Sequence, residues 1–157
     1  MRKITNIFVS LFYSGYFKIY PGTFGSFISI LILFPVIKYK FLSFEIFIIF
    51  FLLIFILSLF FISKFSTYTK SHDSGVIVID EFLGIYIIFI FYDYVFIYND
   101  ILTIILIFTI FRFFDITKIF PANIIDKKMN NALGVLLDDI VAGVYTILAI
   151  VVLNVFS

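Results

Sequence analysis

The sequence of 157 residues contains no cysteine, no tryptophan and only one histidine. The absence of cysteine excludes disulfide bonds, thiolate metal sites and a cysteine nucleophile. Charged residues make up 13% of the chain, whereas soluble domains average about 25%. This low charge content argues against a nucleic-acid-binding module, so we expect no nucleic-acid partner. It also leaves too few polar side chains to cover the surface of a soluble protein.

Apolar side chains take the place of the missing charges, since 64% of the residues are hydrophobic and 25 are Phe. We predict a single domain, residues 1–157, with an all-α fold: a membrane-embedded helical bundle with about 4–5 hydrophobic helices. The apolar segments are continuous rather than alternating, which disfavours membrane β-strands. Only the second is long enough to cross a bilayer without its flanking residues. The five segments are residues 25–37, 41–62, 82–98, 101–114 and 140–156.

The N-terminal residues carry an apolar stripe at helical spacing. This N-terminal stripe consists of Ile4, Ile7, Phe8, Leu11 and Phe12. It predicts an N-terminal amphipathic helix suited to lying along a membrane interface. A signal peptide is the alternative, because Arg2 and Lys3 precede the apolar residues, but no clear small-residue cleavage site follows.

The basic residues are distributed unevenly between the two ends of the predicted bundle. If all five segments cross, the N-terminus and the loops 63–81 and 112–139 share one side. Most of the eleven Lys and Arg residues lie there. The positive-inside rule makes this side cytoplasmic, although Lys38 and Lys40 lie on the other side. We therefore expect a multi-pass membrane protein whose polar helix ends meet at the cytoplasmic face.

Acidic residues gather at these helix ends. The candidates are Asp80, Glu81, Asp115, Asp138 and Asp139. Carboxylates at a membrane boundary are costly unless they are paired or bind a metal ion. A hard divalent cation such as Mg²⁺ prefers oxygen ligands and would relieve the repulsion between them. The sequence therefore indicates a Mg²⁺ site on this face.

Two glycines share a helix face with two of these acids. Gly84 follows Asp80 by four residues, and Gly143 follows Asp139 by four. Residues four apart are neighbours on one helix face, and small residues there permit close helix packing in a membrane. We therefore expect these helices to approach closely beside the acids.

Two further features are typical of phosphate binding. Arg112, Asp115 and Lys118 are spaced three apart, so they can form a chain of ion pairs, and both cations can hold a phosphate. Residues 20–26 offer backbone amides at a helix N-terminus, which is an anion-binding arrangement. Each feature taken alone also fits a turn, a helix cap or a structural ion pair. Their coincidence on one face favours a functional site.

Four stretches of the chain are similar to the signature blocks of the phosphatidylglycerophosphatase A family. They are YPGTFGS (20–26), HDSGVIVIDEFLG (72–84), FRFFDITKIFP (111–121) and GVLLDDIVAGV (134–144). The resemblance implies a bacterial membrane enzyme of phospholipid biosynthesis, mostly α-helical and Mg²⁺-dependent. It would remove the phosphate from phosphatidylglycerophosphate in the cytoplasmic (inner) membrane, with its active site facing the cytoplasm. The chain departs from the family's usual pattern at Ile119, where a proline is common, and at Asn131-Ala132, where Gly-Gly is common.

The resemblance, together with the residue chemistry, suggests roles for the acids. Four of them are expected to hold Mg²⁺, directly or through water: Asp80, Glu81, Asp138 and Asp139. Asp115 would be a further ligand or would position the attacking water. His72 or Asp73 would assist proton transfer to the leaving glycerol oxygen.

The remaining candidates would bind the substrate. Arg112 and Lys118 would neutralise the phosphoryl oxygens. The first polar stretch would seat the phosphate through Gly22, Thr23, Gly25 and Ser26.

Two alternatives come from other functional classes. A CDP-alcohol-type phospholipid head-group transferase also uses clustered Asp and Mg²⁺, but its Asp-Gly-x-x-Ala-Arg pattern is missing here. A small membrane transporter or scaffold would spread its charges across the bilayer depth, whereas these charges gather at helix ends. Neither the composition nor the motifs indicate an oligomeric state.

Overall fold

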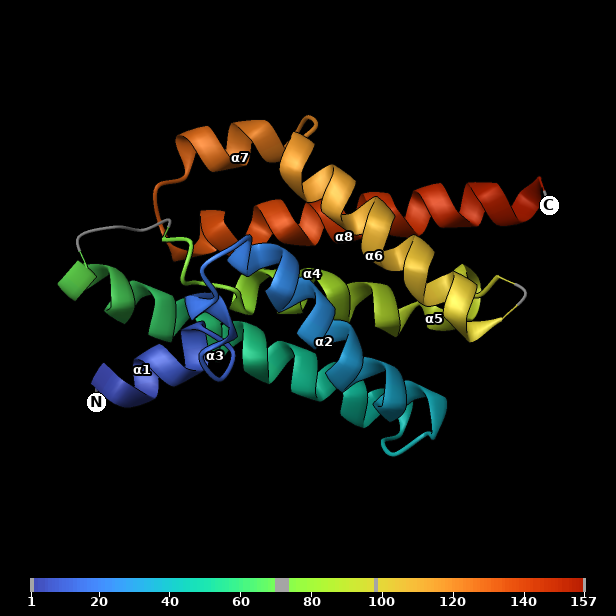
Figure 1. The fold of residues 1–157 in the computed structure, drawn as a ribbon, viewed down its shortest axis with the longest axis horizontal. Helices are drawn as coiled ribbons and strands as arrows, with labels where there is room; N and C mark the ends of the chain where they lie inside the picture. The colour runs from blue at the N-terminus through green and yellow to red at the C-terminus, as the bar shows by residue number, and fades with distance from the viewer. Residues whose placement is uncertain (1, 70–73, 98, 157) are drawn as a thin grey trace.

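The computed structural model describes residues 2–69, 74–97 and 99–156, and these residues form helices and connecting turns without any strand (Figure 1). A short 3₁₀ helix, η1 (Ser14–Tyr16), follows the first α-helix. The α-helices are α1 (Arg2–Val9), α2 (Pro21–Lys38), α3 (Phe44–Thr69), α4 (Ile79–Ile90), α5 (Tyr92–Val95), α6 (Asp100–Thr117), α7 (Ala122–Lys128) and α8 (Ala132–Val155). The all-α prediction is confirmed.

Three helices in the described part of the chain, α2, α3 and α8, are long and apolar enough to cross a membrane. Large apolar side chains such as Leu52, Ile56 and Phe60 are exposed along α3. An apolar surface of this kind is stable when lipid rather than water surrounds it. The chain is therefore a membrane protein, as its composition predicted.

The helix boundaries differ from those of the predicted segments. Helix α3 covers Phe44–Thr69 rather than 41–62, and α8 begins at Ala132 rather than at residue 140. Residues 82–98 do not form one helix, because α4 ends at Ile90 and a turn at Phe91 separates it from α5. The first segment is longer than expected, because α2 begins at Pro21 and continues through Pro35. Proline is well tolerated at Pro21, since the first residues of a helix have no intrahelical partner for the missing N–H.

The predicted N-terminal helix is present as α1, but it is shorter than the N-terminal stripe. It ends at Val9, and the backbone of Leu11 and Phe12 adopts positive φ angles that reverse the chain. The residues that α1 buries are Thr5 and Val9 rather than those of the stripe. Part of the stripe nevertheless reaches the core, because Phe8 packs against Phe61 of α3 with ring centroids 4.6 Å apart and Leu11 is buried, whereas Ile4 and Phe12 stay exposed.

Helix α4 is the centre of the bundle, packed against α2, α3 and α8, and nine of its twelve residues are buried. Its crossing with α8 is closest at two glycines, as predicted. A Cβ atom on Gly84 would lie 2.7 Å from the Asp139 carbonyl oxygen, and one on Gly143 would lie 2.4 Å from the Gly84 carbonyl oxygen. The close crossing brings the first turn of α4 beside Asp138 and Asp139.

The polar helix ends meet in one half of the bundle, as predicted. Figure 1 shows the beginnings of α2, α4 and α8 and the end of α6 in the same half, with α7 joining α6 to α8 across it. Asn131 is the N-cap of α8, and its side-chain oxygen accepts a hydrogen bond from the Gly134 N–H at 2.9 Å. This departure from the family's usual Gly-Gly thus stabilises the start of α8, which carries two of the acids.

Candidate active site

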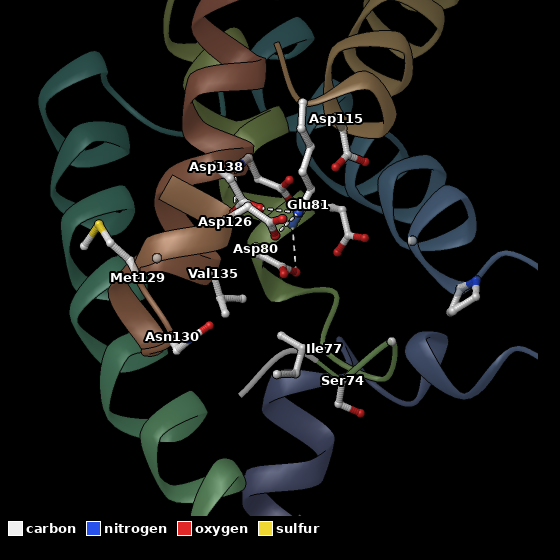
Figure 2. Close-up of a pocket in the computed structure, with 16 residues that line it drawn as sticks. Ser74, Ile77, Asp80, Glu81, Asp115, Asp126, Met129, Asn130, Val135 and Asp138 are labelled. Atoms are coloured by element: carbon white, nitrogen blue, oxygen red, sulfur yellow. Dashed lines mark hydrogen bonds and ion pairs between the residues drawn. The ribbon is translucent and has the colours of Figure 1, made fainter. Parts of the chain in front are cut away.

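A pocket of about 310 Å³ lies among these helix ends, and six carboxylates line it. They come from four helices: Asp80 and Glu81 from α4, Asp115 from α6, Asp126 from α7, and Asp138 and Asp139 from α8. In Figure 2 the labelled carboxylates surround one common space. The five acids that the sequence singled out are therefore brought together, and Asp126 joins them.

Asp80, Glu81 and Asp139 form the tightest group, because one carboxylate oxygen from each lies within 4.8 Å of the others. Glu81 and Asp139 are buried, and Asp80 is half-buried. The Oε2 atom of Glu81 is buried without a hydrogen-bond partner. Buried polar atoms normally have partners, so this oxygen is available to a cation. The group has the donor chemistry of a site for a hard divalent ion.

Burial disfavours the ionised forms of the two acids on α4. It raises the pKa of the Glu81 carboxyl well above its ordinary value; Asp80 and Asp115 raise it further, and Arg112 opposes them. Burial also raises the pKa of Asp80, and the charge of Asp115 adds to this effect. A bound cation would reverse these shifts, because it favours the carboxylate forms.

Asp138 has a different partner from Asp139, since adjacent helical residues are rotated by about 100°. Its Oδ2 atom accepts a hydrogen bond from Lys118 Nζ at 2.7 Å, and Lys118 also forms an ion pair with Asp126. Burial alone would lower the pKa of Lys118, but these two carboxylates outweigh it and raise the pKa above its ordinary value. Lys118 therefore stays positively charged in the pocket.

This pairing differs from the predicted chain of ion pairs on α6. Lys118 is the C-cap of α6 and has a left-handed backbone, with φ of 42°. Its ion pairs go to Asp126 and Asp138 rather than to Asp115. The reason is that Lys118 lies past the last helical turn, so the three-residue spacing no longer places it on the same face as Asp115.

Arg112 forms the predicted ion pair with Asp115. Its Nη1 atom also lies 3.9 Å from Glu81 Oε1 and donates to Ser26 Oγ at 3.5 Å. The Nε atom of Arg112 is buried without a partner. Arg112 therefore joins α6 to the metal-binding candidate Glu81 on α4 and to Ser26 on α2.

The predicted phosphate seat on α2 is only partly beside the pocket. Gly22 lines it, and a Cβ atom there would lie 2.2 Å from Glu81 Oε1. Ser26 does not line the pocket, but its hydroxyl donates to the carbonyl oxygen of Gly22 at 2.9 Å and accepts from Arg112. Gly25 packs against Val78, which would be 2.7 Å from an added Cβ. Thr23 lines a different hollow, among aromatic side chains of α2 and α6. The structure therefore brings Gly22, but not Thr23, to the carboxylates.

Three acidic or basic residues of this region remain: His72 and Asp73, which the sequence proposed, and Asp126, which it did not. His72 and Asp73 lie outside the described residues, so their roles stay predictions. Asp126 lines the pocket and was missed. It lies in the 112–139 loop that the sequence places on this face. Because charged residues are rare in this chain, an acid in that loop could have been predicted to join the other carboxylates.

Comparison with known proteins gives consistent matches. The sequence model of the family described as Phosphatidylglycerophosphatase A matches residues 7–154. Phosphatidylglycerophosphatase A of Haemophilus influenzae is 34% identical over 139 residues, which are 88% of this chain and 82% of that protein. Phosphatidylglycerophosphatase A of Escherichia coli is 38% identical over 73 residues, 46% of this chain and 40% of that protein. No solved structure matches the chain. Because the family model matches residues 7–154 and the Haemophilus influenzae relative covers most of the chain, the chain belongs to the phosphatidylglycerophosphatase A family.

Proposed function

We propose that this protein is a Mg²⁺-dependent phosphatase of phospholipid biosynthesis that hydrolyses phosphatidylglycerophosphate to phosphatidylglycerol and inorganic phosphate. The observation that carries the proposal is the cluster of Asp80, Glu81 and Asp139 at one end of a membrane bundle. Both relatives named above are phosphatidylglycerophosphatases by name. A site at one end of a membrane bundle would be within reach of a lipid head group.

The residues fit a Mg²⁺ ion. Three carboxylates offer oxygen ligands, and Glu81 also has an oxygen, Oε2, that is buried without a partner. Asp80, Glu81 and Asp139 would hold the ion. Asp138, which pairs with Lys118, would bind a water molecule coordinated to the ion. The bound ion would supply positive charge that polarises a phosphoryl oxygen and lowers the pKa of a coordinated water.

The charge balance of the pocket supports the requirement for a cation. Six carboxylates line it, and among the described residues Arg112 and Lys118 are the cations paired with them. A phosphate monoester carries about −1.5 to −2 charges at neutral pH. The acids would repel it unless further positive charge were present. We therefore expect the metal ion to be needed for substrate binding as well as for chemistry.

The protein side chains would bind the phosphate and move protons. Lys118 faces the pocket and would exchange its carboxylate partners for phosphoryl oxygens, which Arg112 would help to neutralise. Asp115 would position the attacking water and accept its proton. The bond between phosphorus and the terminal glycerol oxygen breaks, and water supplies the new oxygen on phosphorus. The leaving glycerol oxygen takes a proton, for which His72 or Asp73 is the proposed source.

The proposed orientation places the pocket at the cytoplasmic face of the inner membrane. The basic residues that flank this end support it under the positive-inside rule. Lys38, one of the two exceptions, forms an ion pair with Asp100 at the opposite end of the bundle. The rule counts Lys and Arg residues rather than net charge, so Lys38 and Lys40 oppose the proposed orientation and are outnumbered by the basic residues at the pocket end.

The experiment is phosphate release from phosphatidylglycerophosphate by the purified protein in detergent, with and without Mg²⁺. We expect equal amounts of phosphate and phosphatidylglycerol, only with Mg²⁺ and without a second substrate. Asp139→Asn and Asp80→Asn should abolish the activity, whereas Asp93→Asn, an exposed acid on α5, should retain it. A requirement for an alcohol co-substrate would instead indicate a head-group transferase. Full activity of Asp139→Asn would contradict the metal site.

A further inference from the structure

A second cavity, of about 320 Å³, lies beside the first turn of α4 and is lined by apolar side chains. It contains all five residues of the N-terminal stripe, together with Ile32 of α2, Ile54 of α3, and Ile79 and Phe82 of α4. We call this cavity the apolar groove. Leu11 and Phe8 of the stripe also pack against the core, so the two stripe residues that the core leaves exposed are Ile4 and Phe12.

The apolar groove and the acidic pocket share the first turn of α4. Ile79 and Phe82 line the groove, while Asp80 and Glu81, between them in sequence, line the pocket. An α-helix with its side chains is about 10 Å across, so the two cavities are about one helix apart. A ligand with a polar end and an apolar end could therefore occupy both.

The apolar groove also reaches the depth that a lipid chain requires. On the continuous helix α2, Gly22 borders the pocket and Ile32 borders the groove. Ten residues of helix cover about 15 Å, which is about half of the 30 Å hydrocarbon core of a bilayer. Ile32 therefore lies about 15 Å along α2 from the residue that borders the pocket, a distance comparable with the thickness of one leaflet.

The inner lining of the apolar groove is buried at Leu11, Ile79 and Phe82, but its outer lining is open to an apolar occupant. Ile4 is 62% exposed and Phe12 is 78% exposed, although both line the groove. The core of the bundle does not cover them, and no charged side chain among the described residues lines this cavity. A hydrocarbon chain matches such a surface, whereas a polar ligand would lose its hydration without gaining hydrogen bonds.

We propose that the apolar groove binds one acyl chain of the phospholipid substrate while the terminal phosphate of the same molecule lies in the acidic pocket. This inference rests on the proposed function and adds to it a subsite for the lipid tail. The glycerol–phosphate–glycerol linkage of the head group passes over the first turn of α4. The groove thereby selects a membrane-anchored phosphate ester over a soluble one.

A matched pair of tryptophan variants on α3 tests the acyl-chain subsite. Ile54→Trp fills the apolar groove, and Ile56→Trp places the same ring on the exposed surface of the same helix, where Ile56 is 64% exposed. Ile32→Trp fills the groove from α2 and guards against a local folding defect at Ile54. Each variant is assayed with long-chain phosphatidylglycerophosphate and with its deacylated, water-soluble head group.

We expect Ile54→Trp and Ile32→Trp to raise KM for the long-chain substrate by about tenfold or more. Their kcat/KM for the deacylated head group should match the unmodified protein, and Ile56→Trp should change neither value. Equal effects on both substrates, or equal effects of Ile54→Trp and Ile56→Trp, would overturn the subsite. So would equal kcat/KM of the unmodified protein for the two substrates.

A labelling experiment separates this subsite from the proposed activity. Phosphatidylglycerol with a photoactivatable group in its acyl chain is irradiated with the protein in vesicles, and the labelled peptides are mapped. We expect labelling of the N-terminal stripe that Ile54→Trp removes and Ile56→Trp retains. Labelling confined to the exposed face of α3 would indicate surrounding membrane lipid and overturn the proposal. If neither substrate released phosphate, the proposed function would fail, and the labelling alone would decide the subsite.

Discussion

Gly143 of α8 packs against the backbone of Gly84 of α4, so closely that a Cβ atom on Gly143 would lie 2.4 Å from the Gly84 carbonyl oxygen. Asp139 and Asp80 each lie one helical turn before their glycine, on the same face. The distance between the two helices therefore sets the distance between two of the three proposed metal ligands. The close packing of Gly84 and Gly143 thus determines how far apart Asp80 and Asp139 lie.

Gly143→Ala should consequently damage both stability and activity. The added methyl group meets backbone atoms of α4, which cannot move away as a side chain can, so the two helices must separate. We expect a loss of about 1–3 kcal/mol in the free energy of unfolding and a lower affinity for Mg²⁺. The measurements are thermal unfolding in detergent and a Mg²⁺ titration of activity. Val144→Leu, at the exposed neighbouring position, is the control and should change neither.

Gly22→Ala should weaken the metal site without separating any helices. A Cβ atom on Gly22 would lie 2.2 Å from Glu81 Oε1, so the Glu81 side chain must shift. Gly75→Ala is a matched control in the same pocket, because among the described residues its Cβ would meet Pro21 Cγ alone, at 3.8 Å. We expect a higher Mg²⁺ concentration for half-maximal activity in Gly22→Ala and no change in Gly75→Ala. The same Mg²⁺ dependence in both variants would count against Glu81 as a ligand.

Mg²⁺ should stabilise the folded protein, because ion binding to the native state adds to the free energy of unfolding. At a Mg²⁺ concentration about a hundred times Kd the gain is about 2.7 kcal/mol. We expect EDTA to lower the unfolding temperature of the unmodified protein. Glu81→Gln should unfold at a temperature that no longer depends on Mg²⁺, while Asp93→Asn keeps the dependence. A Mg²⁺ effect that survives in Glu81→Gln would place the ion elsewhere.

Lys118→Met should impair the reaction more than Asp126→Asn. The first change removes a cation from the pocket and leaves Asp138 without its partner at 2.7 Å. The second removes one of two carboxylates that hold Lys118 and leaves the cation in place. By comparison with other groups that stabilise transition-state charge, we expect kcat to fall about 10²–10³-fold in Lys118→Met. A smaller effect from Lys118→Met than from Asp126→Asn would show that Lys118 does not contact the phosphate.

The natural absence of cysteine makes the orientation directly measurable. A single cysteine at Lys128, exposed at the end of α7, should react in intact cells only with membrane-permeant reagents. A cysteine at Tyr39, exposed after α2 at the opposite end, should also react with an impermeant reagent from the periplasm. The reverse pattern would place the pocket on the periplasmic side.

The sequence by itself determined the helices, the membrane environment and the identity of most of the candidate residues. Apolar composition and continuous apolar segments are properties of the chain, and they are enough to specify buried or lipid-facing helices. The ion pair between Arg112 and Asp115 and the positions of Gly84 and Gly143 one turn after an acid also follow from spacing within single helices. These features are local, because the helical repeat alone determines which residues of one helix lie on the same face.

Only the tertiary structure decided which partner each side chain has. Asp139 joins Asp80 and Glu81, while its neighbour Asp138 pairs with Lys118. Thr23 faces away from the carboxylates that Gly22 borders. These contacts depend on how each helix is rotated about its axis and on where it ends, and both are set by packing against other helices. No spacing within one segment contains that information, which is why the sequence could name the acids but not arrange them.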